Sequence, residues 1–185
     1  MLFGRTAKAE DFEAAAMPYL NELFRVALRV IGDRSEAEDL VQEAYLQAWK
    51  SFHRFEPGTN CRAWLYKILF NVIHQHRRKW FNNKMVKEND EMLEQTLAYE
   101  PPIPQRLSDE DVLRAFEKLP HAYREVVLLT DVEELSYKEA AETLGIPMGT
   151  VMSRLSRGRK LLRAELAGFA EGYGIKNAKA MGDGE

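Results

Sequence analysis

Cysteine is almost absent from the sequence, and this excludes several classes of protein. Cys61 is the single cysteine among 185 residues, so no internal disulfide can form, and no Cys and His residues have the spacing of a zinc site. Residues 1–10 lack the apolar segment of a signal peptide, and no apolar run approaches the roughly 18 residues of a membrane span. We therefore expect a cytoplasmic protein with no metal, no cofactor and no membrane insertion.

Motifs of the common enzyme classes are also missing. The sequence has no phosphate-binding glycine loop, no HExxH zinc motif and no nucleophile elbow. His74 and His76 are two residues apart on a predicted helix, so they point to different faces and make a poor metal pair. We predict that the protein is not an enzyme.

Alternating strand patterns are lacking as well, and apolar residues recur at helical spacing almost everywhere. A first helix fits Asp11 to Ile31, with a kink or break at Pro18 and an end at Gly32. The residues Ser35-Glu36-Ala37-Glu38 form a capping-box pattern that begins a helix reaching about Phe52. The sequence predicts an all-α fold.

A turn at residues 55–59 precedes a further predicted helix, which Thr59 or Asn60 caps and which runs to Arg78. After Asn82 the periodicity fades into an acidic, proline-containing stretch, which helices do not tolerate internally. We therefore expect two small helical domains joined by this stretch. The predicted divisions are an N-terminal domain at 10–82, a linker at 83–107, a C-terminal domain at 108–168 and a flexible tail at 169–185.

The C-terminal domain has the pattern of a helix-turn-helix. A helix begins at Ser108, Pro120 interrupts it, and a further helix spans about Ala122 to Val132. The capping box of residues 136–139 then begins a short helix that ends at Gly145, and Pro147 suits the first turn of a long basic helix. On that helix the face opposite the apolar stripe is predicted to enter a major groove, and it comprises Gly149, Thr150, Ser153, Ser156, Arg157 and Lys160.

The formal net charge of −3 conceals two basic blocks. Residues 57–87 contain seven Lys or Arg and no acid, and residues 148–163 contain five more and no acid, whereas residues 88–117 carry a net charge of −7. Either block alone can be an ordinary solvated helix face. Together they indicate nucleic-acid surfaces, because phosphate responds to local charge.

Aromatic and amide side chains are interleaved with bases in residues 55–80, a combination suited to unpaired DNA bases. The simpler interpretation of Trp64, Ile68 and Val72 is that they face the core. An ordinary helical hairpin with a basic exterior remains the alternative for the last helix.

Three segments resemble extracytoplasmic-function (ECF) sigma factors of RNA polymerase, and they occur in the family's order. They are residues 35–49 (SEAEDLVQEAYLQAW), residues 58–68, and residues 136–162 with the run GTVMSRL at 149–155. The spacing of residues 52–55 before 58–60 is similar to the branch of thiol-stress sigma factors. The resemblance implies a protein that directs promoter-specific initiation in a stress response.

The resemblance also implies roles for residues and partners. The implied partners are core RNA polymerase, promoter DNA and an anti-sigma factor, and we expect a monomer when these are absent. Core polymerase would bind Asp39, Leu40, Gln42, Glu43 and Leu46. The minus-ten element would bind Phe55, Gly58, Thr59, Asn60, Arg62, Lys67, Asn71, Gln75 and Arg78. The minus-thirty-five element would bind Gly149, Thr150, Met152, Ser153, Arg154, Ser156, Arg157 and Lys160.

One position departs from the commonest family pattern, because Met152 stands where many members carry a basic residue. This leaves the base preference of the last helix open. A stand-alone helix-turn-helix regulator is the alternative function, and it explains residues 136–162 equally well. It does not explain the aromatic and basic block at 55–80.

Overall fold

The computed structural model describes residues 3–84 and 108–172, and all regular structure in these ranges is helical. The N-terminal half contains α1 (Phe3–Ala16), η1 (Met17–Tyr19), α2 (Leu20–Ile31), α3 (Arg34–Ser51), η2 (Phe52–Arg54) and α4 (Cys61–Lys84). The C-terminal half contains α5 (Asp109–Glu117), α6 (His121–Val127), the π-helix η3 (Leu128–Val132), α7 (Tyr137–Leu144) and α8 (Met148–Gly172). The predicted all-α fold is confirmed. A search of the described helices finds none with the length and apolarity needed to cross a membrane.

Pro18 divides the first predicted helix, as the sequence indicated. It lies at the start of the 3₁₀ turn η1, which separates α1 from α2. Proline lacks the backbone N–H that an α-helix requires, so the chain changes direction there. Gly32 ends α2 with a φ of +86°, and its N–H donates to the carbonyl of Leu28. Such a left-handed cap favours glycine because it has no Cβ.

The predicted capping box at Ser35 is wrong. Asp33 caps α3 instead: its backbone is extended and its carboxylate accepts from the N–H of Glu36 over 2.8 Å. Because Asp33 supplies an acceptor two residues earlier, α3 already begins at Arg34 and places Ser35 inside its first turn.

The core of the N-terminal half lies between α2, α3 and α4, which pack against one another. Tyr45 on α3 donates its hydroxyl to the carbonyl of Ala16 over 2.8 Å, which ties the end of α1 to this bundle. Of the three α4 residues expected to face the core, Val72 is buried, and Trp64 and Ile68 are half-buried against it. The principal buried side chains are Leu23, Val26, Val30, Leu40, Val41, Leu65, Tyr66, Leu69, Phe70 and Ile73.

The C-terminal half begins with a capping box in which Ser108 and Asp111 bond reciprocally. The predicted helix from Ala122 to Val132 is not one α-helix: α6 ends at Val127 and continues as the π-helix η3. The predicted capping box of Ser136 and Glu139 is confirmed, as is the end of α7 at Gly145, which has a φ of +66°. The helix-turn-helix is therefore formed by α7 and α8.

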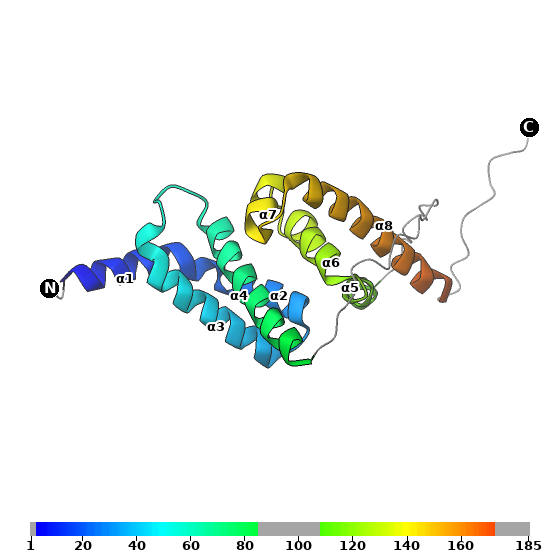
Figure 1. Ribbon diagram of the computed structural model, residues 1–185, viewed down its shortest axis with the longest axis horizontal. Coiled ribbons are helices and arrows are strands. Elements are labelled where there is room, and N and C mark those ends of the chain that lie inside the picture. The colour runs from blue at the N-terminus through cyan, green and yellow to red at the C-terminus, as the bar shows by residue number, and fades with distance from the viewer. Residues whose placement is uncertain (1–2, 85–107, 173–185) are drawn as a thin grey trace, which may run out of the picture.

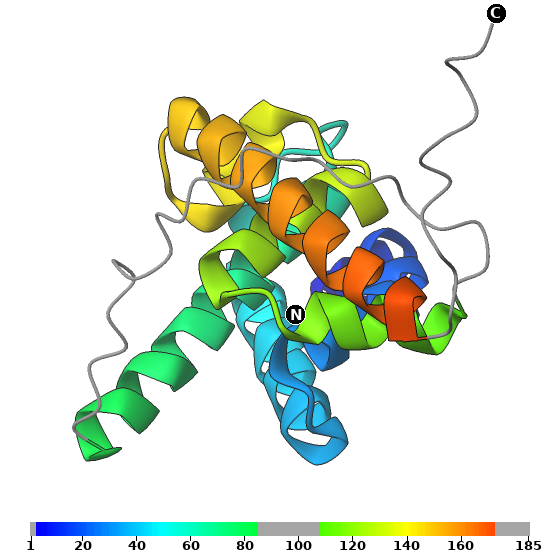
Figure 2. The same cartoon turned by 90° about the vertical axis from the view of Figure 1, so that its right-hand side faces the viewer.

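The two halves pack against each other, with α7 lying along α4 and α6 approaching α2 (Figure 1). Figure 2 shows the same arrangement from the side, with α8 crossing α6 on the far side of the C-terminal half from α4. Buried side chains from both halves belong to one apolar cluster. The predicted linker at 83–107 lies outside the described residues, except for 83 and 84 in α4. The segment predicted as a tail belongs to α8 as far as Gly172, and 173–185 lie outside the described residues.

Candidate nucleic-acid interface

Four of the residues predicted to bind the minus-ten element form an exposed stripe along α4. Lys67, Asn71, Gln75 and Arg78 succeed one another at intervals of four, four and three residues, and all four are exposed. This spacing places them on one face of a helix. We call this set the α4 stripe; it presents two bases and two amides to solvent.

The loop before α4 packs aromatic rings beside an open pocket. The ring of Phe55 stacks on Phe52 with centroids 5.7 Å apart and also contacts Trp64 at 5.1 Å. Gly58 turns the loop with a φ of +90°, and Thr59 donates its hydroxyl to the carbonyl of Glu56 over 2.7 Å. The pocket has a volume of about 700 Å³, and Asp11, Ala14, Ala15, Phe52, His53, Phe55, Pro57 and Gly58 line it.

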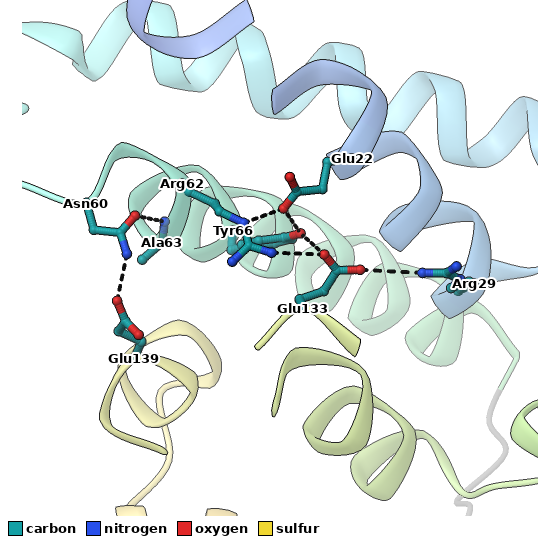
Figure 3. Close-up of polar contacts among 8 residues, drawn as sticks. All are labelled: Glu22, Arg29, Asn60, Arg62, Ala63, Tyr66, Glu133 and Glu139. Atoms are coloured by element: carbon teal, nitrogen blue, oxygen red, sulfur yellow. Dashed lines mark hydrogen bonds and ion pairs between the residues drawn. The ribbon is translucent and has the colours of Figure 1, made fainter. Parts of the chain in front are cut away.

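Asn60 and Arg62, also predicted to bind the minus-ten element, contact the C-terminal half instead (Figure 3). Asn60 caps α4 by accepting from the N–H of Ala63 over 3.1 Å, and its amide donates to Glu139 of α7 over 2.7 Å. Arg62 forms ion pairs with Glu22 and Glu133, the latter at 3.1 Å. Both side chains therefore bond to carboxylates; Arg62 is half-buried there, whereas Asn60 remains exposed.

Glu133 is the centre of this contact. It is 7% exposed, and it receives hydrogen bonds from Arg62, from the hydroxyl of Tyr66 at 2.8 Å and from Arg29 at 3.4 Å. The Tyr66 hydroxyl also lies 2.7 Å from Glu22. One hydroxyl hydrogen serves only one carboxylate at a time, so Arg62 supplies the additional donors that two neighbouring carboxylates require.

The ionisation of this cluster follows from its burial and its partners. Burial, with hydrogen bonds to both carboxylates, raises the pKa of Tyr66, so its hydroxyl stays a donor. Burial of Glu22 opposes its ionisation, but hydrogen bonds from Tyr66 and Arg62 outweigh this and hold its pKa below the usual value. Burial alone would lower the pKa of Arg62, yet its hydrogen bond to Glu22 raises it.

A second polar cluster joins the halves about three turns further along α4. Arg77 donates to Glu125 of α6 over 2.7 Å and to the carbonyl of Val30 over 3.1 Å. His74 Nε2 lies 3.1 Å from the other oxygen of Glu125, which is 5% exposed, and His121 Nδ1 lies 3.0 Å from Arg77. Two bases of the first basic block, Arg62 and Arg77, thus face acids of the C-terminal half.

The face of α8 predicted to read duplex DNA is open to solvent. Gly149, Ser153, Ser156, Arg157 and Lys160 are exposed, and Met152 among them is 51% exposed. Thr150 and Arg154 are half-buried at the edges of this face. Beside it lies a hollow of about 320 Å³ lined by Tyr137, Met152, Leu155, Ser156, Arg159, Lys160 and Arg163. The opposite side of the helix is buried through Val151 and Leu155, as predicted.

The residues predicted to bind core polymerase lie on α3. Asp39, Gln42, Glu43 and Leu46 are exposed on one face, and Leu46 is 57% exposed despite its apolar side chain. We call these four residues the α3 stripe. Leu40 differs from them because it is 3% exposed and belongs to the core, where it supports the stripe from beneath. No group of three or more His, Cys, Asp or Glu in the described ranges has the arrangement of a metal site.

Comparison with protein-family models matches both halves. Residues 16–81 match Sigma-70 region 2, and residues 109–162 match Sigma-70, region 4. The chain is 35% identical over 161 residues to the ECF RNA polymerase sigma factor EcfG of Rhodopseudomonas palustris, an alignment that covers 87% of this chain and 86% of the relative. The chain belongs to the ECF sigma factor family. The prediction of a sigma factor, which binds core RNA polymerase and promoter DNA, is confirmed.

Other relatives agree with this assignment. The sigma factor is 34% identical to the ECF sigma factor SigE of Mycolicibacterium smegmatis over 168 residues, which cover 84% of this chain and 64% of that relative. It is 31% identical to SigW of Bacillus subtilis over 158 residues, covering 80% of this chain and 84% of SigW. Members of the family are transcription initiation factors and not enzymes. The narrower resemblance to the thiol-stress branch is not confirmed.

Solved structures show the same fold. A co-crystal structure of the sigma factor RpoE with the anti-sigma factor NepR, from Bartonella quintana, superposes with a TM-score of 0.69 and 31% identity, covering 85% of this chain and 98% of that one. The structure of CnrH in complex with the cytosolic domain of CnrY superposes with a TM-score of 0.56 at 22% identity, covering 92% and 96% of the two chains.

Several structurally important residues of the sigma factor were missed from the sequence. Glu125 and Glu133 gave no local signal, because their partners lie 48 to 104 residues away along the chain. Arg159, one of the five bases at 148–163, pairs in a bidentate manner with Asp131 of η3 at 2.9 and 2.6 Å. Gly158 lies on the buried side of α8, where a Cβ would come within 2.8 Å of Val127.

Proposed function

We propose that this sigma factor directs promoter-specific transcription initiation through three surfaces with separate tasks. The observation that carries the proposal is the exposure of two basic and polar surfaces, the α4 stripe and the outer face of α8, on different halves of the chain. The domain divisions proposed are 10–82 for core and minus-ten binding, 108–168 for minus-thirty-five binding, and 83–107 and 169–185 for the linker and tail.

The α4 stripe and the loop before it bind the minus-ten element as an opened strand. Amide side chains such as Asn71 and Gln75 form hydrogen bonds to base edges, while Lys67 and Arg78 neutralise phosphates. The aromatic wall of Phe52 and Phe55 gives an unpaired base a ring to stack on, beside a pocket of about 700 Å³. Unstacking a base costs a few kcal/mol, which these contacts must offset.

The outer face of α8 reads the minus-thirty-five element as duplex. Glycine and small hydroxyl residues at the start of the helix, Gly149, Thr150 and Ser153, allow the backbone to approach the groove closely. Arg157 and Lys160, two exposed bases one turn further on, reach guanine edges or phosphates. Met152 adds an apolar contact, which suits a thymine methyl group better than a phosphate.

The α3 stripe docks on core polymerase. An exposed leucine beside two carboxylates and an amide combines an apolar anchor with a polar rim, the usual composition of a protein interface. Trp49, which is 36% exposed on the same helix, extends the apolar part. Leu40 holds the helix in place from the core side.

Control by an anti-sigma factor completes the proposal. The similarity to RpoE, whose structure contains the anti-sigma factor NepR, supports a comparable inhibitor for this chain. We further propose that release of the factor belongs to a stress response, that it acts in the cytoplasm, and that it is a monomer when its partners are absent.

Run-off transcription with purified core polymerase and a promoter library tests the proposal. We expect initiation that depends on this factor and a consensus with two short elements. Gel filtration with core polymerase provides a second readout, in which the factor co-elutes with core. A chain that never co-elutes and supports no initiation would be a stand-alone helix-turn-helix regulator, although the match of residues 16–81 to Sigma-70 region 2 disfavours that alternative.

A further inference from the structure

Three carboxylates of the C-terminal half stand along α4 where a nucleic acid would bring its phosphates and base edges. Glu139 accepts from Asn60, Glu133 from Arg62 and Tyr66, and Glu125 from Arg77. They come from α7, from the turn after η3 and from α6 respectively. Each therefore faces a donor on or at the start of the same helix that bears the α4 stripe.

We propose that these carboxylates form an acidic latch that imitates DNA and closes part of the minus-ten surface in the free chain. The latch is Glu125, Glu133 and Glu139. It rests on the proposed function, because that function assigns Asn60 and Arg62 to the opened strand. In the closed arrangement the amide of Asn60 bonds to Glu139 and one guanidinium nitrogen of Arg62 bonds to Glu133, so single-stranded DNA and the C-terminal half compete for these donors.

The backbone is shaped to present the central carboxylate. Immediately before Glu133 the chain forms the π-helix η3, and immediately after it Glu134 adopts a φ of +54°, a positive value that no other described non-glycine residue shares. Non-glycine residues rarely adopt this conformation, which persists only where the surroundings stabilise it. The reach of Glu133 to Arg62, Tyr66 and Arg29 supplies that stabilisation.

The latch is suited to opening because a buried ion pair adds little net stability. Removing Glu133 and Glu125 from water costs much of what their attraction to Arg62 and Arg77 returns. Phosphates arriving at α4 offer the same arginines an equivalent partner. A polyanion or a docked partner can therefore exchange with the latch without leaving the arginine charges unpaired.

The latch covers part of the minus-ten surface only. The outer face of α8, with Arg157 and Lys160, remains exposed while Asn60 and Arg62 are engaged. Opening the latch should therefore change the affinity for single-stranded DNA and leave the affinity for duplex DNA unchanged. This difference separates a DNA-imitating latch from a general effect of removing negative charge.

The experiment uses the full chain with Glu125→Gln, Glu133→Gln and Glu139→Gln combined. Glutamine keeps the shape of each side chain and can still complete the capping box with Ser136. Arg62 keeps Glu22 as its partner, so the N-terminal half should fold normally. The matched control removes three exposed carboxylates outside the latch: Glu10→Gln, Glu13→Gln and Glu142→Gln. Circular dichroism checks folding, and the single variant Glu133→Gln replaces the triple one if that fails to fold.

Two measurements decide the matter. Small-angle X-ray scattering should give a larger radius of gyration for the latch variant than for the control. Fluorescence anisotropy with a labelled 20-nucleotide oligothymidylate should show about tenfold tighter binding by the latch variant, as expected if about one wild-type molecule in ten is open. A labelled 20-base-pair duplex should bind latch and control variants equally.

An unchanged radius of gyration would show that the carboxylates do not hold the halves together. Expansion without tighter oligothymidylate binding, or an equal gain on the duplex, would overturn the imitation of DNA. None of these readouts uses polymerase. A factor that fails in run-off transcription yet opens as described would therefore refute the proposed function and not the latch.

Discussion

The guanidinium of Arg62 lies between two carboxylates from opposite halves of the chain, Glu22 on α2 and Glu133 after η3. The single hydroxyl of Tyr66 lies within hydrogen-bond distance of the same two carboxylates. An arginine assigned to promoter DNA is therefore also the main polar connection between the two halves. Binding of Arg62 to DNA and its pairing with the C-terminal half are therefore alternatives that experiments on this molecule can compare.

Loss of the two exposed bases on α8 should weaken recognition of duplex DNA. Because Arg157 and Lys160 project from the outer face, changing both to Ala should reduce minus-thirty-five-dependent initiation and duplex affinity by about tenfold or more. Co-elution with core polymerase should persist. The double variant Arg25→Ala with Lys50→Ala removes two exposed bases elsewhere and serves as the control. Promoter use equal to that of the control would contradict the assignment of this face.

Reversal of one charge in the α3 stripe should impair docking. Glu43 is exposed and accepts a hydrogen bond from Gln47 over 3.1 Å, so Glu43→Lys leaves the core packing intact. Like charges brought together at an interface cost several kcal/mol, and we expect at least a tenfold loss of affinity for core polymerase. Glu13→Lys on α1 is the control. Normal co-elution of the Glu43 variant on gel filtration would remove the stripe from the docking surface.

Gly158 should not tolerate a methyl group although it lies inside a helix. A Cβ there would approach Val127, which is 2% exposed, to 2.8 Å, and Tyr123 to 3.3 Å. Overpacking costs about 1–3 kcal/mol, against a gain of about 1 kcal/mol in helix propensity, so Gly158→Ala should lower the free energy of unfolding by about 1 kcal/mol.

Gly149 provides the comparison within the same helix. A Cβ there meets nothing within 4 Å, and because Gly149 is the second residue of α8, Gly149→Ala should raise the free energy of unfolding only slightly, by up to about 0.5 kcal/mol. Thermal unfolding measures both changes, at about 2–4 °C per kcal/mol for a chain of this size. Equal melting temperatures for the two variants would argue against close packing of α8 on α6.

Acid should weaken the fold through Glu22. Its pKa is lower in the folded chain than the usual 4.5, so the unfolded chain binds more protons in this range. Its contribution is fully present above about pH 4.5 and is lost as pH falls through the lower folded value. Urea unfolding between pH 7 and pH 3 should show this loss, and Glu22→Gln should be less stable at pH 7 with a shallower dependence on pH. Parallel curves for the two proteins would exclude Glu22 as the source.

Local features of the fold could be predicted from the sequence because they depend on neighbouring residues. Pro18, Gly32, Gly145 and the pair Ser136 and Glu139 act within one helical turn, and all four predictions are confirmed. The prediction of a capping box at Ser35 was wrong for a reason that is also local. Asp33 offers an earlier acceptor, and the sequence pattern alone does not rank the two residues.

The exposed part of the candidate site was also predictable. Helical periodicity places Lys67, Asn71, Gln75 and Arg78 on one face, and the same rule exposes Arg157 and Lys160. The partners of Asn60 and Arg62 were not predictable, because they depend on how the two halves pack. A local segment of sequence does not show whether a basic side chain lies on a nucleic-acid surface or pairs with a distant acid.

The π-helix η3 sets the rotational position of the residues that follow it in the chain. Its extra residue lets the N–H of Glu133 bond to the carbonyl of Leu128, five positions back. One residue turns a helix by about 100°, so deleting a single position from 128–130 would swing Asp131 away from Arg159 and Glu133 away from Arg62 in one step. The pair that holds the groove-facing helix and the pair that joins the two halves therefore both depend on the number of residues in η3. Substitutions of side chains alone would leave this dependence intact.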